Sequence, residues 1–367
     1  NGQTVNFTVE FSEPVTLVGG TIQLGMDSGG TAIVSTCANS TTATASYTVG
    51  PGQNSPDLTV NIGTITLSAG TLTDAAGNGT DLTVPPSNLG VMSDIVIDTA
   101  APSLASISSS MMGSYGLGST IFMDVNFTEP VTLAGTLELI LDTGDVVSVT
   151  GSYPTTMLSG SFTVGAGDNS PDLTVSSINL TGTLRDAALN DADTAIETGE
   201  NLAENAGIVI DTTAPTISSI TSSTANGWYN NMSSVDITVN MSEPVTLAGA
   251  CNVQLDTGAI VSVSSAVYPA TVLNGTYAIG AGENSPDLDA TGVSIAGTLT
   301  DAAGNGADTT LPGSNLAVNK AIVIDTIAPA VDYITSATAA GAYNEPDAID
   351  VTVAFTEPVT CGGSITV

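Results

Sequence analysis

Four short motifs recur along the chain in one order and at one spacing, and this repetition constrains the fold more than any other feature of the sequence. The most regular motif, (S/T)EPV, places its glutamates 116, 114 and 114 residues apart, at Glu13, Glu129, Glu243 and Glu357. The motifs NSPDL, DAAGN and IVIDT, with small variations, recur between these glutamates. A repeated series of this kind predicts homologous domains. Its period of about 114 residues suits a β-sandwich, which needs roughly 100.

The segment before each glutamate alternates apolar and polar residues. In the third copy, Val235, Ile237, Val239 and Met241 occupy every second position. Alternation with a period of two indicates a strand with one buried and one solvated face, as in an antiparallel sandwich sheet. The IVID segment that begins at Ile208 is interpreted as the last strand of its domain. We therefore expect an all-β fold of antiparallel β-sandwich domains.

The IVIDT motif marks the domain boundaries, because a proline follows it shortly and a new apolar strand then begins. Boundaries at Asp98, Asp211 and Asp325 predict a repeat over 1–98 that lacks its first strand, complete repeats over 99–211 and 212–325, and the opening strands of a fourth repeat over 326–367. Linkers of only a few residues should hold neighbours nearly end to end, so an extended rod is expected. Because the series starts and stops inside a repeat, we expect the chain to be part of a longer polypeptide.

The charge balance excludes several classes of partner. The chain has 36 acidic residues against two basic ones, Arg185 and Lys320, and its formal net charge is −34. Nucleic acid is excluded because neutralising phosphates requires a basic surface, and an anionic membrane is disfavoured for the same reason. No apolar run approaches the roughly 18 residues of a membrane-spanning helix, so no direct membrane insertion is expected. The carboxylates must be offset by distance, salt or a bound divalent cation.

The three cysteines follow no metal-binding spacing. Cys37, Cys251 and Cys361 fall in three different repeats. We interpret them as small buried apolar side chains and expect no zinc site.

The segments FSEPVTL, TVGAGDNSPDL, GTLTDAAGN and NKAIVIDTIAP together resemble the immunoglobulin-like repeats of giant bacterial surface proteins and adhesins. The resemblance implies tandem immunoglobulin-like antiparallel β-sandwich domains in an extended rod at the cell surface. It also implies that the repeats are mostly stalk, and that calcium binds at the junctions between domains. The second copy departs from the pattern, because Leu189 replaces the glycine of DAAGN and an acidic insert follows over 191–204.

Strand direction brings several acidic residues to each junction. If strands run alternately up and down from a linker, Glu243 and the turn over 301–305 lie at the same end of the repeat as Asp211. Loops of the preceding repeat should face the same junction with further aspartates. Calcium prefers such oxygen ligands, whereas two carboxylates about 6 Å apart repel by roughly 3 kcal/mol at an effective dielectric of 20. The predicted ligands are Asp98, Glu129, Asp186, Asp211, Glu243, Asp301, Asn305, Asp325, Glu357, Asp142 and Asp172.

A simpler interpretation competes with the metal site for each aspartate. Asp and Asn in DAAGN, NSPDL and DTG are common turn formers that bond their own backbone. This alternative is weaker for the glutamate of SEPV, because glutamate is a poor turn former.

Enzymatic function is not expected. The chain contains no histidine, so Ser–His and Cys–His catalysis are unavailable in it. Paired carboxylates could serve a glycosidase, but every pair recurs with the repeat, which indicates architecture. The favoured function is a calcium-stiffened stalk of an extracellular surface adhesin, whose partners are neighbouring repeats of the same chain. Two alternatives remain open: a building block that self-associates with other copies into a surface fibre or sheath, and spacer modules of a secreted polysaccharide-degrading enzyme.

Overall fold

The computed structural model describes residues 2–363, so the predicted outer limits at residues 1 and 367 lie outside the described residues. The fold is all-β, as predicted. The helices of the described part are three single turns, α1 (Leu89–Met92), α2 (Leu202–Asn205) and α3 (Leu316–Asn319), and none is long and apolar enough to cross a membrane. The chain divides into two compact units, Asn1–Gly113 with Gly118–Val164 and Ser170–Ile210, and Ser114–Leu117 with Gly165–Asn169 and Asp211–Val367. The first unit holds the first two repeats and the second holds the rest, apart from two short segments of repeat two.

The first repeat forms one six-stranded sheet in the order β5-β2-β3-β4-β1-β6. Its long first strand pairs antiparallel with β4 along one half and with β6 along the other. The strands are β1 (Thr4–Val18), β2 (Ile22–Met26), β3 (Thr31–Val34), β4 (Ser40–Thr48), β5 (Val60–Leu67) and β6 (Thr71–Thr73).

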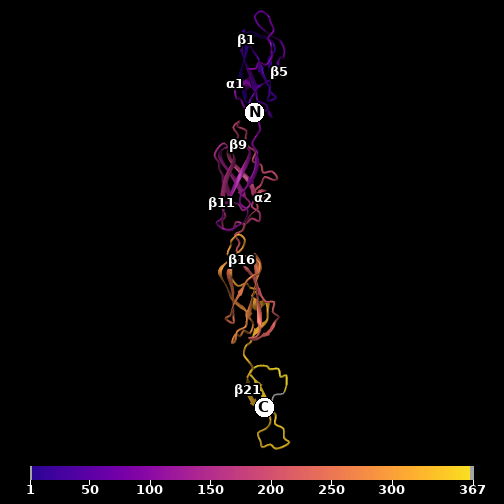
Figure 1. The fold of residues 1–367 in the computed structure, drawn as a ribbon, viewed down its shortest axis with the longest axis vertical. Helices are drawn as coiled ribbons and strands as arrows, with labels where there is room; N and C mark the ends of the chain where they lie inside the picture. Colours follow the sequence, from indigo (N-terminus) through magenta and orange to yellow (C-terminus); the bar gives the residue numbers. More distant parts are fainter. Residues whose placement is uncertain (1, 364–367) are drawn as a thin grey trace. The chain divides into compact units, whose positions relative to one another are not determined.

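The second repeat is organised around a 22-residue strand, β9. The first half of β9 pairs with β7 and β11, and its second half pairs with β10 and β12. One strand therefore belongs to both layers of the sandwich. Figure 1 labels β9 and β11 in this repeat. The strands are β7 (Leu104–Ser108), β8 (Gly113–Tyr115), β9 (Thr120–Leu141), β10 (Val146–Val149), β11 (Thr155–Thr163), β12 (Val175–Arg185) and β13 (Ile208–Ile210).

The third repeat has the same plan, with β16 as the shared strand. Its IVI segment forms β20, which pairs parallel with β15 and is the last strand of the repeat, as predicted. The strands are β14 (Ile217–Thr221), β15 (Gly227–Tyr229), β16 (Ser234–Leu255), β17 (Ile260–Val263), β18 (Ala270–Ala278), β19 (Ala290–Thr300) and β20 (Ile322–Ile324).

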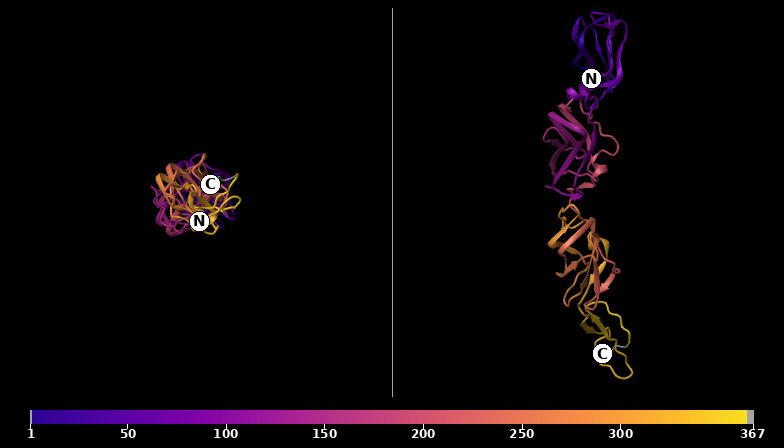
Figure 2. Two further views of the ribbon diagram at one scale, coloured as in Figure 1. Left: turned by 90° about the horizontal axis from the view of Figure 1, so that it is seen from below. Right: turned by 45° about the horizontal axis from the view of Figure 1, so that its top comes forward.

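After the third repeat, the described part of the chain contains two further strands among long loops (Figure 2, right). β21 (Val331–Thr335) pairs antiparallel with β22 (Thr352–Phe355). These strands correspond to the opening of the other repeats.

The glutamate of the SEPV motif sits where the shared strand passes from one layer to the other. Before this point the alternation predicts burial correctly, because Ile121, Met123 and Val125 are all buried. Between Asn126 and Val131 the register with β11 shifts. Pro130 cannot donate to the ladder, and the short stretch left unpaired with β11 is a bulge. The bulge releases Glu129 from the sheet without ending the strand, as happens at Glu13 and Glu243.

The interpretation of the cysteines holds for two of the three. Cys37 and Cys251 are buried and form no disulfide within the described residues. Burial raises the pKa of Cys251 to about 11. Cys361 is exposed, so its prediction as a buried side chain was wrong. It lies beyond β22, in a segment without a second layer to cover it.

Leu189 gives the first testable prediction. It has φ 71°, the left-handed conformation that Gly304 adopts with φ 88° at the equivalent turn, and its side chain is 62% exposed. A residue with a Cβ is destabilised in this conformation by roughly 1–2 kcal/mol. Glycine avoids that cost but loses roughly 0.5–1 kcal/mol more chain entropy on folding. We expect Leu189→Gly to stabilise the second repeat by about 0.5–1 kcal/mol in denaturant unfolding. The matched change Gly304→Leu should destabilise the third repeat; the opposite sign in either variant would contradict this account.

Candidate metal centre

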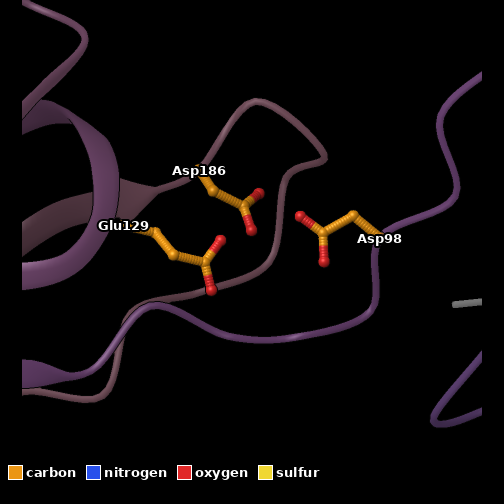
Figure 3. Close-up of side chains that lie close together, drawn as sticks. All are labelled: Asp98, Glu129 and Asp186. Atoms are coloured by element: carbon orange, nitrogen blue, oxygen red, sulfur yellow. The ribbon is translucent and has the colours of Figure 1, made fainter. Parts of the chain in front are cut away.

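Three carboxylates from separate parts of the chain meet at the start of the second repeat. Asp98 lies in the linker, Glu129 in the bulge of β9 and Asp186 in the turn after β12. One oxygen from each lies within 4.8 Å of the others. Figure 3 shows the three side chains pointing toward one another. We call this group the first triad.

The same arrangement recurs in the third repeat. Asp211, Glu243 and Asp301 also bring one oxygen each within 4.8 Å of one another, and we call them the second triad. The aspartate that follows β12 or β19 is buried in both, since Asp186 is 6% exposed and Asp301 7%. The structure therefore gathers six of the predicted ligands into two equivalent groups.

The asparagine of the DAAGN turn holds each triad in place. In the third repeat, the Asn305 side-chain amide donates to Asp301 Oδ2 at 2.8 Å and to the backbone carbonyl of Asp211 at 2.8 Å. The Asn305 backbone N–H donates to Asp301 Oδ1 at 2.9 Å. Because both side-chain partners are acceptors, the nitrogen faces them and the amide oxygen faces away. Asn305 was predicted as a ligand, but its contacts are those of a positioning residue.

Asn190 makes the same contacts in the second repeat. Its amide donates to Asp186 Oδ2 at 2.8 Å and to the carbonyl of Asp98 at 3.2 Å. In both repeats, an asparagine therefore ties the linker backbone to the turn that carries the buried aspartate.

A second asparagine, in NSPDL, holds the residue after each linker aspartate. Asn169 Oδ1 accepts the backbone N–H of Thr212 at 2.9 Å, and Asn54 and Asn284 do the same for Thr99 and Thr326. Sequence reasoning missed this role. The recurrence of NSPDL and IDT at fixed separation was the signal that could have found it.

The glutamate is the member of each triad whose negative charge is least compensated. Among residues 2–363, no hydrogen-bond donor contacts the carboxylate of Glu129 or of Glu243, whereas Asp186 and Asp301 accept several. Burial raises the pKa of Glu129, and the charges of Asp98 and Asp186 raise it further. Burial, then Asp211 and Asp301, raise the pKa of Glu243 in the same way. Burial and neighbouring negative charges both disfavour the ionised form of a carboxyl group.

The arginine next to the first triad does not neutralise it. Arg185 Nε donates to Asp191 Oδ1 at 2.5 Å, in the acidic insert. This pair lowers the pKa of Asp191. Thr300 and Gly306 occupy the equivalent positions in the third repeat, so the pair is not part of the repeated architecture.

The pKa of the glutamates leads to a prediction with a definite sign. A folded pKa above the ordinary value of 4.5 means that the calcium-free folded state keeps a proton that the unfolded chain has lost. The resulting stability is present below that ordinary value and is lost as the pH rises through the raised pKa. We expect calcium-depleted protein to lose melting temperature through this window relative to a Glu129→Gln, Glu243→Gln double variant. Parallel pH curves for the two proteins would contradict the prediction.

Not every predicted ligand joins a triad. Asp142 Oδ2 accepts the Ser170 hydroxyl at 2.6 Å, and its Oδ1 accepts the Thr174 amide at 3.2 Å. Asp27 and Asp256 accept from Ser55 and Ser285 in the same way, so this aspartate braces the NSPDL loop. Neither Asp142 nor Asp172 belongs to the acidic groups formed by the described residues.

Asp325 and Glu357 form at most a partial site in the described chain. Asp325 Oδ1 accepts the Ile327 amide at 3.0 Å. Asp98 and Asp211 likewise each accept the backbone amide of the residue two positions later. Within residues 2–363, Glu357 Oε1 is buried and has no hydrogen-bond partner.

The triads fit a calcium ion by chemistry and by size. All three ligands are carboxylates, which are acceptors only when ionised. Calcium binds oxygen at about 2.3–2.6 Å, so two of its ligands lie at most about 5 Å apart. The separation within each triad satisfies this limit without rearrangement. Backbone carbonyls and water would have to complete the coordination of six to eight oxygens.

Comparison with known proteins yields no family. No family model matches the chain, and no curated protein matches it. Among solved structures, one similar chain is a Ca2+-stabilised adhesin that helps an Antarctic bacterium reach out and bind ice, with 19% identity and a TM-score of 0.30 over 91% of this chain and 72% of that one. Another is a tandem from titin, with 5% identity and a TM-score of 0.24 over 89% and 94%. At these TM-scores neither likeness supports a conclusion about this chain.

Proposed function

We propose that the chain is a structural segment of an extracellular surface protein, a stalk whose β-sandwich repeats bind calcium beside their linkers. The observation that carries the proposal is the recurrence of the three-carboxylate group at the same place in both complete repeats. A single acidic group could arise by chance on so acidic a chain. Two equivalent groups, each with a buried aspartate and an unpaired glutamate, indicate a shared requirement.

A cation at a triad would act on the linker. Asp98 and Asp211 are linker residues, whereas the other two ligands of each triad belong to the sandwich that follows. An ion bound by all three carboxylates would remove their mutual repulsion and restrain the linker against that sandwich. Each hydrophobic core would stay folded without the ion, because it consists of buried apolar residues whose packing does not depend on charge. Calcium would therefore change stiffness more than it changes folding.

A non-enzymatic role agrees with this arrangement. The three-carboxylate group occurs in each complete repeat, whereas an active site is seldom duplicated in every domain. Acidic composition and tandem β-sandwich repeats also suit an extracellular protein, where calcium is abundant.

Calorimetric titration of calcium-depleted protein tests the proposal. We expect two calcium ions per chain, one at each triad, with heat that magnesium at equal concentration reproduces only weakly. Small-angle scattering with calcium and with chelator should then show a longer, stiffer particle in calcium. The absence of both a calcium-dependent heat and a change in scattering would leave turn formation as the role of these acids.

A further inference from the structure

One of the asparagines that hold the triads is followed by glycine, and this pairing makes a thermolabile residue more reactive still. The amide of the glycine can attack the side-chain carboxamide, and a side chain on the second residue hinders that attack. Among residues 2–363, glycine follows asparagine at Asn78, Asn226, Asn274 and Asn305. Of these four, Asn305 is the one whose side chain bonds both a buried triad aspartate and a linker carbonyl.

The fold does not require glycine after Asn305. The φ of Gly306 is not positive, and a Cβ added to it would meet no atom within 4 Å. Asp191 occupies the equivalent position in the second repeat. By contrast, a Cβ on Gly275 would lie 2.5 Å from the carbonyl oxygen of Ser262, so that glycine is needed for packing. Reactivity, rather than backbone geometry, therefore distinguishes the glycine at 306.

The attacking nitrogen of this pair is available. Gly306 is exposed, and among residues 2–363 its amide donates no hydrogen bond. At the pair formed by Asn226, the amide of Gly227 instead donates to the carbonyl of Ala321 at 3.0 Å. The turn after β19 thus offers a free nucleophile where the loop before β15 does not.

The carboxamide under attack is held in place by the closed turn. Its two side-chain bonds, to Asp301 and to the Asp211 carbonyl, commit the amide nitrogen. The backbone of Asn305 is held too, because its N–H donates to Asp301 Oδ1 and its carbonyl accepts the Asp301 amide at 3.2 Å. A bond to a charged group holds its partner by about tenfold or more. Reaction is therefore confined to molecules in which the turn has opened.

We propose that Asn305–Gly306 is a latent deamidation site, which converts only when the linker junction opens. The Gly306 nitrogen forms a bond to Asn305 Cγ while the bond from Cγ to Nδ2 breaks. A proton passes from the attacking nitrogen to the leaving one, so ammonia departs and a cyclic imide remains. Water then opens the imide at either carbonyl, which leaves aspartate or isoaspartate at position 305.

The product would prevent the turn from closing again. An ionised carboxylate has no proton to donate, so it cannot make the two bonds that Asn305 donates to Asp301 and to the Asp211 carbonyl. The loss is permanent, because the departed ammonia is not replaced. Each conversion would leave one junction less firmly held.

The part that calcium plays in this reaction rests on the proposed function. An ion that binds only the closed junction lowers the fraction of open molecules, so calcium well above its Kd should slow conversion of Asn305 by about tenfold or more. Asn78 is exposed and belongs to neither triad, so its conversion should be the same with calcium and without it. The Asn305–Gly306 pair would then record how long the junction has been without its ion.

Incubation of the full chain at mildly alkaline pH, in calcium and in chelator, tests the proposal. Peptide mapping by mass spectrometry follows each asparagine separately. In chelator we expect Asn305 to convert, while Asn190 stays intact because Asp191 follows it. In calcium the conversion of Asn305 should fall behind that of Asn78, which serves as the clock within the same molecule.

Gly306→Ala is the matched variant. The added Cβ meets no atom, so the fold should be kept, whereas the methyl group should suppress conversion at 305 and leave Asn78 unchanged. Wild-type chain aged in chelator should afterwards bind calcium at the first triad alone, and the aged variant at both. These results together would establish the site and its effect on the junction.

Three outcomes would overturn the proposal. The first is an Asn305 that stays intact in chelator while Asn78 converts. The second is equal conversion at 305 in Gly306→Ala, and the third is an aged, converted chain whose second triad binds calcium as before. Conversion that calcium does not slow would instead support the deamidation site and contradict calcium binding at the second triad, so the two proposals can fail separately.

Discussion

Glu243→Gln should reduce the number of bound calcium ions from two to one and leave the first triad unaffected. The glutamate is the one triad member without a hydrogen-bond donor among the described residues, so its charge is compensated by nothing else there. Replacing even a residue that only orients a metal ligand typically costs 10–100-fold in affinity, so loss of a ligand should cost at least about tenfold. Calorimetry measures the stoichiometry, and hydrogen exchange of β19 shows which repeat has lost protection.

The same variant should behave oppositely without calcium. Glutamine removes a partly buried carboxyl group whose pKa is raised by burial and then by repulsion from Asp211 and Asp301. The calcium-free variant should therefore melt above calcium-free wild type, whereas calcium-saturated wild type should melt above the saturated variant. Glu129→Gln should give the matching result in the second repeat. Glu13→Gln should change neither, because Glu13 belongs to neither of the acidic groups formed by the described residues. Equal effects in calcium and in chelator would contradict a metal site.

Asn305→Ala should destabilise the third repeat by about 2–3 kcal/mol, the upper range for a hydrogen bond to a charged group. The change removes the donor to the buried carboxylate of Asp301 and the donor to the linker carbonyl of Asp211. Calcium affinity at the second triad should fall as well, since the turn would no longer be held. Calorimetric unfolding of the full chain, with hydrogen exchange to assign the transition, measures the loss.

Two controls separate a positioning role from ligation. Asn78→Ala removes a similar bond to Asp74 in the first repeat, where the carboxylate is not buried. Its cost should be about 1 kcal/mol or less. Asn305→Asp should weaken the site, because it places an oxygen against Asp301 and Asp211. If Asn305→Asp instead tightens calcium binding, residue 305 ligates the ion through oxygen.

Sequence reasoning located the fold and six triad residues because two periodicities carry that information. The alternation at Val235, Ile237 and Val239 fixes which face of a strand is buried, and the 114-residue recurrence shows which polar residues share a fixed place. Up-and-down strand order then brought Asp211, Glu243 and Asp301 to one end, as the structure has them. The predicted domain limits and the extended rod remain predictions.

What sequence reasoning did not anticipate is a set of hydrogen bonds that periodicity cannot reveal. Asn305 and Asp142 were both predicted as ligands, because side-chain oxygens of Asn and Asp suit calcium equally well on paper. Their actual partners, the Asp211 carbonyl and the Ser170 hydroxyl, depend on where separate loops meet in space. The continuity of β9 through Pro130 was also missed, since proline within a strand usually signals its end.

The composition of each triad has a consequence for how such a gene can grow. Two ligands come from within a repeat, and the third is the last residue of the repeat before it, where the linker begins. Copying one period of the gene therefore adds one complete triad of carboxylates at the new junction. The existing triads are not disturbed. A chain built this way can lengthen or shorten by unequal recombination between its own repeats, with every intermediate length equally complete at its internal linkers.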